Sequence, residues 1–192
     1  MPLGLPNCRN GDSMKFRSDI RQWNTPAQLN QHIQQYDPAI CSWVRSIVIH
    51  HTYRPTPLTW SGISSMKSLE RYYTQLGWDA GPHLFICADA PAPSYNGIFQ
   101  LTALNEVGIH AGVCNNSTWG IEVVGDYDSA PWSLQTTHMV AQSVAYLMKW
   151  INLPVNPTTI KGHRDCNSPK TCPGRAINLD AFRDIVQVYR YA

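Results

Sequence analysis

Two histidines and one cysteine of this 192-residue chain are candidate metal ligands. His50 ends a β-branched run, Val44 to His50, and His163 begins a loop that also contains Cys172. Two imidazole nitrogens and a thiolate are ordinary zinc ligands, and three protein ligands leave a fourth position for water. Zinc lowers the pKa of such a water to about 7, so hydroxide becomes available at neutral pH. The residue types therefore favour a catalytic zinc site over a structural one.

Each of these residues also has a plainer interpretation. A single His is more often a surface or hydrogen-bonded core residue, and a single Cys is usually a small buried apolar side chain. Because neighbouring residues of a strand face opposite sides of the sheet, we do not expect His51 to face the same metal as His50. Cys166 lies three residues after His163 and is a rival to Cys172 as the third ligand.

Glu122 is the carboxylate that could act as a general base beside such a metal. Its segment, Gly120 to Val124 (GIEVV), is otherwise apolar and predicts a short strand. Burial raises the pKa of a carboxyl group toward the range in which it can take and return a proton near neutral pH. The alternative is a structural or solvent-facing Glu.

The strands that would position these residues follow from short apolar and β-branched runs. They are expected at residues 44–50, 84–87, 97–101 and 120–124, and the run 160–161 is expected to lead into a loop. Helices are expected between them. Because strands and helices alternate, the chain is predicted to be a single α/β domain with a mixed central β-sheet flanked by helices.

The helices are predicted from apolar residues at helical spacing. Their apolar faces are Leu29, Ile33 and Tyr36; Ile63, Met66, Leu69, Tyr73 and Leu76; Val140, Val144, Leu147 and Ile151; and Leu179, Phe182, Val186 and Tyr189. Pro26 suits the first turn of the first helix, Gly77 is expected to end the second, and Ser133 is expected to cap the third. Residues 1–40 are expected to be an N-terminal arm with a short helix that packs on the core, and residues 41–192 the zinc-binding domain.

The composition narrows the classes of function. Apolar residues make up 43% and charged residues 15%, which is typical of a globular chain. The net charge is +2 without a dense Lys/Arg run, so nucleic-acid binding is not expected. No apolar stretch approaches about 18 residues, and Met1 to Asn10 lacks a signal-peptide pattern. The six cysteines permit disulfides, but their spacing does not decide the pairing.

Five short motifs occur in the order found in one enzyme family. They are Ile47 to Thr52 (IVIHHT), Gly81 to Phe85 (GPHLF), Ile109 to Gly112 (IHAG), Trp119 to Gly125 (WGIEVVG), and Gly162 to Asp165 (GHRD) followed by Lys170 to Gly174 (KTCPG). Together they resemble the type 2 N-acetylmuramoyl-L-alanine amidases, which include phage endolysins, bacterial amidases and animal peptidoglycan recognition proteins. Each motif is unspecific alone, but their order extends over about residues 44–175.

The resemblance implies a zinc-dependent enzyme that hydrolyses the amide bond between N-acetylmuramic acid and the L-alanine of the peptidoglycan stem peptide. It assigns one zinc ion to His50, His163 and Cys172. The segment Lys-Thr-Cys-Pro-Gly matches the family's ligand position, which favours Cys172 over Cys166. Peptidoglycan or muropeptides are the expected partners, and a monomer is expected.

The resemblance also implies roles for residues that do not bind the metal. It makes Glu122 the catalytic carboxylate and Lys170 the cation that faces the scissile carbonyl, although a solvated loop lysine is the alternative. His110 is expected to line the substrate groove. Asn116 and Thr118 are expected to hold the stem peptide.

One residue of the motifs, Pro82, departs from the family pattern. Many relatives carry Tyr where this chain has Pro82, and proline cannot supply a hydroxyl, so more of the chemistry is expected to rest on Glu122. Trp60 and Trp78 are either groove walls or core residues. Asp165 is expected to order the metal loop by hydrogen bonding rather than to touch substrate.

Three rival functions are compatible with parts of the sequence. They are a peptidoglycan-binding module without catalysis, a structural zinc or redox-cysteine protein, and a thiol hydrolase that uses Cys172 with a His. The third ligand at Cys172 argues against the binding module, and paired Cys-x-x-Cys spacings are absent from the sequence. The expected site of action is the bacterial cell wall, in the periplasm or outside the cell. The sequence does not distinguish phage lysis from recycling or from a delivered antibacterial role.

Overall fold

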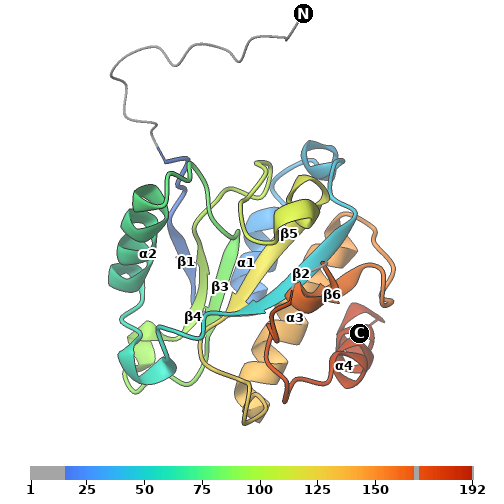
Figure 1. Ribbon diagram of the computed structural model, residues 1–192. Helices are drawn as coiled ribbons and strands as arrows, with labels where there is room; N and C mark the ends of the chain where they lie inside the picture. The colour runs from blue at the N-terminus through green and yellow to red at the C-terminus, as the bar shows by residue number, and fades with distance from the viewer. Residues whose placement is uncertain (1–15, 167–168, 192) are drawn as a thin grey trace, which may run out of the picture.

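The computed structural model describes residues 16–166 and 169–191. Within these residues a six-stranded sheet has the order β1-β4-β3-β5-β2-β6 (Figure 1). The strands are β1 (Arg21–Trp23), β2 (Ser46–His51), β3 (Leu84–Cys87), β4 (Gly97–Gln100), β5 (Thr118–Val123) and β6 (Ile160–Gly162). Strand β2 runs parallel to β5 and β6, and β3 runs parallel to β5, whereas β4 is antiparallel to β1 and β3. The sheet is therefore mixed, as the sequence predicts.

Helices cover the two faces of this sheet unequally. They are α1 (Pro26–Ile33), α2 (Ile63–Gln75), α3 (Leu134–Trp150) and α4 (Leu179–Tyr191). The larger core joins one face of the sheet to α1, α3 and α4, and the smaller core joins the other face to α2. Figure 1 shows α2 apart from the other three helices. The face beneath α2 is thus covered by a single helix and leaves room for a cavity.

The strand pleat divides β3 and β4 between these two cores. In β3, Leu84 and Ile86 belong to the larger core, while Phe85 and Cys87 belong to the smaller one. Successive residues of a strand point to opposite faces, so one apolar run can serve both cores. This alternation also decides which residues of β2 and β5 face the cavity.

Local signals at the helix ends agree with the sequence predictions. The Ser133 hydroxyl accepts a hydrogen bond from the Thr136 amide at 3.0 Å, which caps α3. Gly77, just beyond α2, has a φ of 78°, a conformation that favours glycine. The prediction for Tyr36 is wrong, because α1 ends at Ile33 and the Tyr36 side chain is 46% exposed.

Two short edge strands were not predicted. Strand β1 lies within the predicted N-terminal arm, residues 1–40. Strand β6 covers residues 160–161, which were expected only to lead into a loop, and Gly162. A three-residue strand is too short to show alternation, and its identity depends on a partner. Arg21 pairs with Gln100, and Ile160 pairs with Ile47.

Residues 21–33 make direct contact with the rest of the fold. Strand β1 pairs with β4, and α1 packs on α3. The first fifteen residues of the predicted arm lie outside the described residues. Among the described helices, none combines the length and the apolar character needed to cross a membrane.

Candidate active site

The register of two central strands places a histidine beside a carboxylate. In the parallel pair of β2 and β5, His50 is the direct partner of Glu122. Their apolar neighbours Ile49 and Ile121 point into the larger core, so His50 and Glu122 share the opposite face. The Nδ1 atom of His50 lies 3.9 Å from the Oε1 atom of Glu122. Pleat and register alone therefore bring the two groups together.

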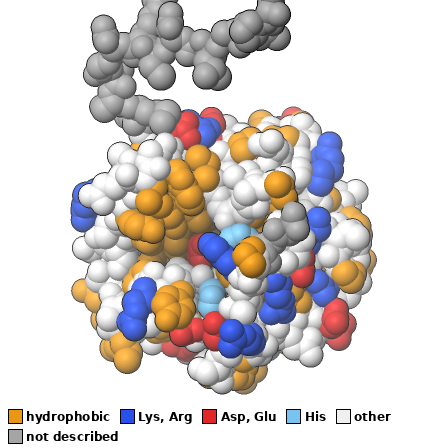
Figure 2. All heavy atoms as spheres, viewed as in Figure 1, with side chains coloured by type: hydrophobic (Ala, Val, Ile, Leu, Met, Phe, Trp, Pro, Cys, Tyr) orange, Lys and Arg blue, Asp and Glu red, His pale blue; other side chains and the backbone are white. Residues whose placement is uncertain are grey.

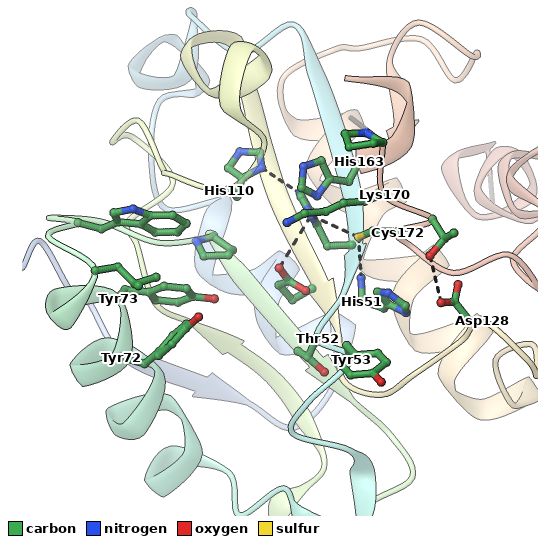
Figure 3. A pocket seen from close by; sticks show the side chains of 17 residues that line it. His51, Thr52, Tyr53, Tyr72, Tyr73, His110, Asp128, His163, Lys170 and Cys172 are labelled. Atoms are coloured by element: carbon green, nitrogen blue, oxygen red, sulfur yellow. Dashed lines mark hydrogen bonds and ion pairs between the residues drawn. The ribbon is translucent and has the colours of Figure 1, made fainter. Parts of the chain in front are cut away.

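His163 and Cys172 come to the same place from the segment after β6. Because β6 pairs with β2, His163 follows directly beside the end of β2. The ring centroids of His50 and His163 are 4.6 Å apart, and the Cys172 sulfur lies 3.6 Å from Nδ1 of His50. One ligand atom from each residue lies within 4.8 Å of the other two. Figure 3 shows His163 and Cys172 on the same side of the cavity, across from Tyr72 and Tyr73.

This donor set suits a zinc ion. Two imidazole nitrogens and a thiolate match the ligands of catalytic zinc sites, which keep a fourth position for water, and all three residues line the cavity. His51 lies outside the cluster, because its Nδ1 atom accepts a hydrogen bond from the Tyr127 amide at 3.2 Å. Its backbone amide instead donates to the Cys172 sulfur at 3.3 Å, which supports a thiolate at that position.

The rival ligand Cys166 is engaged elsewhere. It forms a disulfide with Cys114, which lies in the short 3-10 helix that follows His110. Cys172 is among the described cysteines that carry a free thiol. The disulfide also joins the loop after His110 to the loop after His163.

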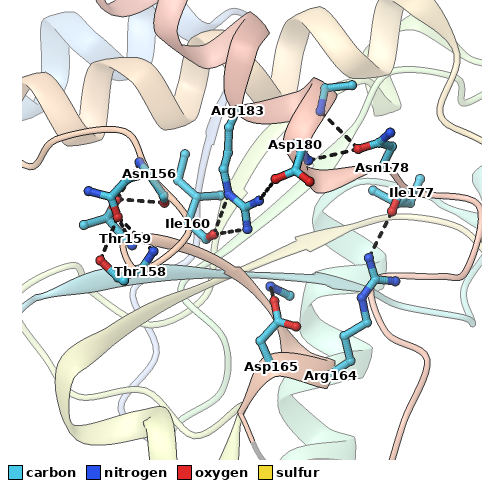
Figure 4. A network of polar contacts seen from close by, with 12 residues as sticks. Asn156, Thr158, Thr159, Ile160, Arg164, Asp165, Ile177, Asn178, Asp180 and Arg183 are labelled. Atoms are coloured by element: carbon cyan, nitrogen blue, oxygen red, sulfur yellow. Dashed lines mark hydrogen bonds and ion pairs between the residues drawn. The ribbon is translucent and has the colours of Figure 1, made fainter.

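Hydrogen bonds order the loop that begins at His163 from within. The Asp165 carboxylate accepts the Gly162 amide at 2.8 Å, a hydrogen bond of the kind that the sequence predicts for it. The Arg164 guanidinium donates to the carbonyl oxygens of Gly174 and Ile177, each at 3.0 Å. Figure 4 shows the Arg164–Ile177 bond and the Asp165 side chain beside the bonds that Arg183 makes to the Ile160 carbonyl. The backbone around His163 is therefore tied to α4 and to the chain that precedes it.

A second set of contacts holds the same loop from the other side. The Asp128 carboxylate, between β5 and α3, accepts the Thr171 hydroxyl and the Arg175 amide, each at 3.0 Å. These contacts bracket Cys172 and restrict where its sulfur can lie. Asp128 was not singled out by the sequence, because a half-buried acidic loop residue carries no local sign of its partner.

Burial sets the protonation of the groups in the cluster. Desolvation raises the pKa of Glu122 to about 8, and the nearby Lys170 cation acts in the opposite direction. Among the described residues, its Oε2 atom has no hydrogen-bond partner. Desolvation also raises the pKa of Cys172 to about 12, with a further rise from the Glu122 charge. Without a metal the thiol is protonated at neutral pH, whereas a bound cation would favour the thiolate.

The cluster opens into a cavity of about 540 Å³. One wall is aromatic and comes from α2 and the segment after it, including Tyr72, Tyr73 and Trp78. The Tyr73 and Trp78 rings stack with centroids 5.2 Å apart. Figure 2 shows hydrophobic side chains gathered on one side of this hollow, with histidine and charged side chains on the other. The opposite wall includes Tyr53 and Lys170.

The remaining predicted site residues lie at different depths. Lys170 lines the cavity, and its side chain points into it in Figure 3. His110 also lines it but is only 8% exposed. Thr118 is 1% exposed and donates its hydroxyl to the Cys114 carbonyl, and Asn116 is exposed beside it. Neither Thr118 nor Asn116 is among the described residues that line this cavity.

The two candidate tryptophans lie in different places, and two tyrosines line the cavity together with one of them. Trp78 lines the cavity, whereas Trp60 is 2% exposed in the smaller core. Tyr73 was assigned to the buried face of its helix, and Tyr72 was not singled out. The signal that could have identified this wall is a helix face whose large residues carry hydroxyl groups, which suits a partly wet surface.

Comparisons with known proteins agree with this fold. A structure of N-acetylmuramoyl-L-alanine amidase LysC from Clostridium intestinale is 23% identical, covers 75% of this chain and 85% of its own, and gives a TM-score of 0.61. The structure of Drosophila PGRP-LB is 20% identical in sequence, with a TM-score of 0.58. The match covers 86% of this chain and 85% of PGRP-LB. The structure of a mutant endolysin from Bacillus subtilis is 21% identical in sequence, with a TM-score of 0.55. The match covers 74% of this chain and 85% of the endolysin. No curated protein sequence matches the chain.

A family model, rather than these distant structures, decides the classification. The model described as N-acetylmuramoyl-L-alanine amidase matches residues 41–175, which is well over half of the chain. The match begins before β2 and ends after Cys172, so it includes every residue of the metal-ligand cluster. The chain therefore belongs to the N-acetylmuramoyl-L-alanine amidase family.

Proposed function

We propose that this protein binds one zinc ion and hydrolyses the amide bond between N-acetylmuramic acid and L-alanine in peptidoglycan. The observation that carries the proposal is the convergence of His50, His163 and Cys172 beside a buried carboxylate in an open cavity. A zinc ion held there would activate a water molecule and polarise the scissile carbonyl. The family membership supports the same reaction class.

Glu122 would manage the proton in this reaction. Its buried carboxyl has an elevated pKa, and its Oε2 atom has no partner among the described residues. Such a group can accept the proton of the attacking water and then deliver it to the leaving amine. Pro82 supplies no hydroxyl for this purpose, so the proposal gives Glu122 the whole proton transfer.

Lys170 would stabilise the charge that develops on the carbonyl oxygen. The side chain lines the cavity, and its charge is felt at Glu122, His50 and Cys172, whose pKa values it lowers. A cation fixed beside the reacting carbonyl favours the transition state more than the neutral ground state.

The cavity suits a muropeptide in size and surface. A volume of about 540 Å³ between an aromatic wall and a polar wall can accept both a sugar ring and a peptide. A mutant of Drosophila PGRP-LB, which shares this fold at 19% identity, has been solved in complex with tracheal cytotoxin. We propose peptidoglycan or its muropeptides as the substrate, with the protein acting as a monomer on the bacterial cell wall.

Digestion of purified peptidoglycan tests the proposal. The wild-type protein, the chelated protein, the zinc-restored protein and Cys172→Ala are compared, and the products are identified by mass spectrometry. We expect stem peptides that begin with L-alanine, lost on chelation, restored by zinc and absent with Cys172→Ala. Wall binding without release in the presence of zinc would favour the binding module instead.

The thiol hydrolase is tested in the same experiment. Burial keeps Cys172 protonated in the metal-free protein, and a protonated thiol is a poor nucleophile. Cleavage that survives chelation would nevertheless overturn the zinc mechanism and favour Cys172 as the nucleophile.

A further inference from the structure

Both ring nitrogens of His50 face defined partners. Its Nδ1 atom lies toward the Cys172 sulfur and the Glu122 carboxylate, at 3.6 Å and 3.9 Å. Its Nε2 atom lies 3.0 Å from Nδ1 of His110, on the far side of the ring. The two imidazoles meet nearly edge to face, with an interplanar angle of 84°. His110 therefore contacts a metal ligand directly, although it lies outside the ligand cluster itself.

The partners of His110 decide which atom donates in this pair. Its Nε2 atom lies 3.3 Å from the carbonyl oxygen of Thr118 and 3.3 Å from the Thr118 hydroxyl oxygen. A carbonyl can only accept, and the hydroxyl already donates to the Cys114 carbonyl at 2.8 Å. The proton of a neutral His110 ring is therefore on Nε2, and its Nδ1 atom is an acceptor.

The position of the proton on His110 also fixes the position of the proton on His50. Because Nδ1 of His110 accepts, the Nε2 atom of His50 must donate. A neutral His50 then carries its lone pair on Nδ1, the nitrogen that faces the metal cluster. Metal-binding histidines are commonly fixed in this way by an acceptor on their second nitrogen.

The surrounding backbone is shaped to hold His110 in this place. The side chain of Asn115 accepts the amides of His110 and Ala111 at 3.0 Å and 2.7 Å. Gly120 leaves space for the ring, because a Cβ atom there would lie 2.5 Å from Cγ of His110. Any other residue at position 120 would displace the ring from His50.

From this arrangement we propose that His110 is a positioning residue that orients His50 for metal binding through Nδ1, rather than a direct contact for substrate. The proposal rests on the zinc site of the proposed function. Its consequence is that His110 acts on metal affinity in the absence of any substrate. A substrate contact would act on KM and leave the metal affinity unchanged.

Two substitutions at position 110 separate these roles. His110→Phe keeps a ring of similar size but removes the acceptor, and we expect zinc affinity to fall about 10- to 100-fold. His110→Asn places an amide oxygen near the position of Nδ1 and should recover most of that loss. Zinc affinity is measured by competition with a chromophoric chelator, and the cobalt-substituted proteins are compared by their thiolate and d–d absorption bands. His138→Phe, which alters a histidine bonded to Tyr189 between α3 and α4, is the matched control.

A measurement on the wild-type protein keeps the proposal testable if His110→Phe fails to fold. Nitrogen-15 NMR of the histidine rings should show His50 and His110 both protonated on Nε2, and zinc should shift Nδ1 of His50. A proton on Nδ1 of His50, or zinc affinity unchanged in a folded His110→Phe, would overturn the proposal alone. A wild-type protein that binds no zinc would overturn the proposed function as well.

Discussion

The two faces of the sheet use the same strands for different purposes. On β5, Ile121 and Val123 enter the larger core beneath α1, α3 and α4, whereas Glu122 between them faces the cavity. The covered face buries apolar side chains, which stabilises the fold. The open face buries a carboxyl group that has no partner on Oε2 among the described residues, which costs stability. A single strand therefore contributes to stability on one face and to chemistry on the other.

This difference has a structural reason. Three helices cover one face, and α2 alone packs on the other, so the ends of β2 and β5 are left open to the cavity. Buried groups with strongly shifted pKa values are commonly found at functional sites. We therefore expect a substitution on the open face to change activity more than stability, and a substitution on the covered face to change stability more than activity.

The largest effect is expected on the open face. Glu122→Gln removes the proton acceptor but keeps the shape, and we expect kcat on peptidoglycan to fall by about 10²- to 10⁴-fold. Because the variant also removes a buried ionisable group, its free energy of unfolding should equal or exceed that of the wild type. Steady-state kinetics and denaturant titration measure the two quantities. A fully active Glu122→Gln would remove Glu122 from the reaction.

A substitution on the covered face should show the reverse pattern. Ile86→Ala deletes a side chain that is 0% exposed in the larger core. We expect unfolding to cost about 2–5 kcal/mol less, from lost burial and the cavity that remains. The zinc affinity and kcat of the folded fraction should change little. A large loss of zinc affinity without a loss of stability would contradict the separation of the two faces.

The smallest effect is a pH dependence that belongs to the open face. The pKa of Glu122 is raised from 4.5 to about 8 in the folded protein. Its contribution to the free energy of unfolding is therefore complete below pH 4.5, the pKa of the unfolded chain, and is lost as the pH rises through the pKa of the folded protein. The pKa of His50 is lowered, so its own effect appears at acidic pH. From about pH 6 to about pH 8, the chelated wild type should lose roughly 1 kcal/mol per pH unit relative to Glu122→Gln.

The measurement is thermal or denaturant unfolding of both chelated proteins across this window. The thiol of Cys172 has a raised pKa and loses its contribution only at more alkaline pH, so it does not obscure the result. Parallel curves for the two proteins would mean that Glu122 is not a buried neutral acid in the metal-free state.

Local patterns were sufficient for much of the fold. The four strands at the centre of the sheet and all four described helices lie close to their predicted positions, because periodicity and capping are properties of neighbouring residues. The edge strands β1 and β6 were missed because their pairing partners are distant in sequence. Tyr36 shows the opposite error, since helical spacing continued past the residue where α1 ends.

By itself the sequence determined the residue types of the site and their order along the chain. His50, His163 and Cys172 were recognisable from motifs, and the apolar residues on either side of Glu122 were enough to indicate its burial. Motifs carry this information because each chemical group sits in a short segment with a recognisable pattern. The segments therefore predict a chemistry, although not the geometry of the site.

Only the tertiary structure decided how these groups are held. It paired Cys166 with Cys114, placed Asp128 against the segment that contains Thr171, and joined His110 to His50 across 60 positions of sequence. Each of these contacts depends on sheet order and strand register, which bring distant segments within hydrogen-bonding distance. A sequence pattern records which residue is present, whereas the partner of a side chain is decided when the whole chain packs.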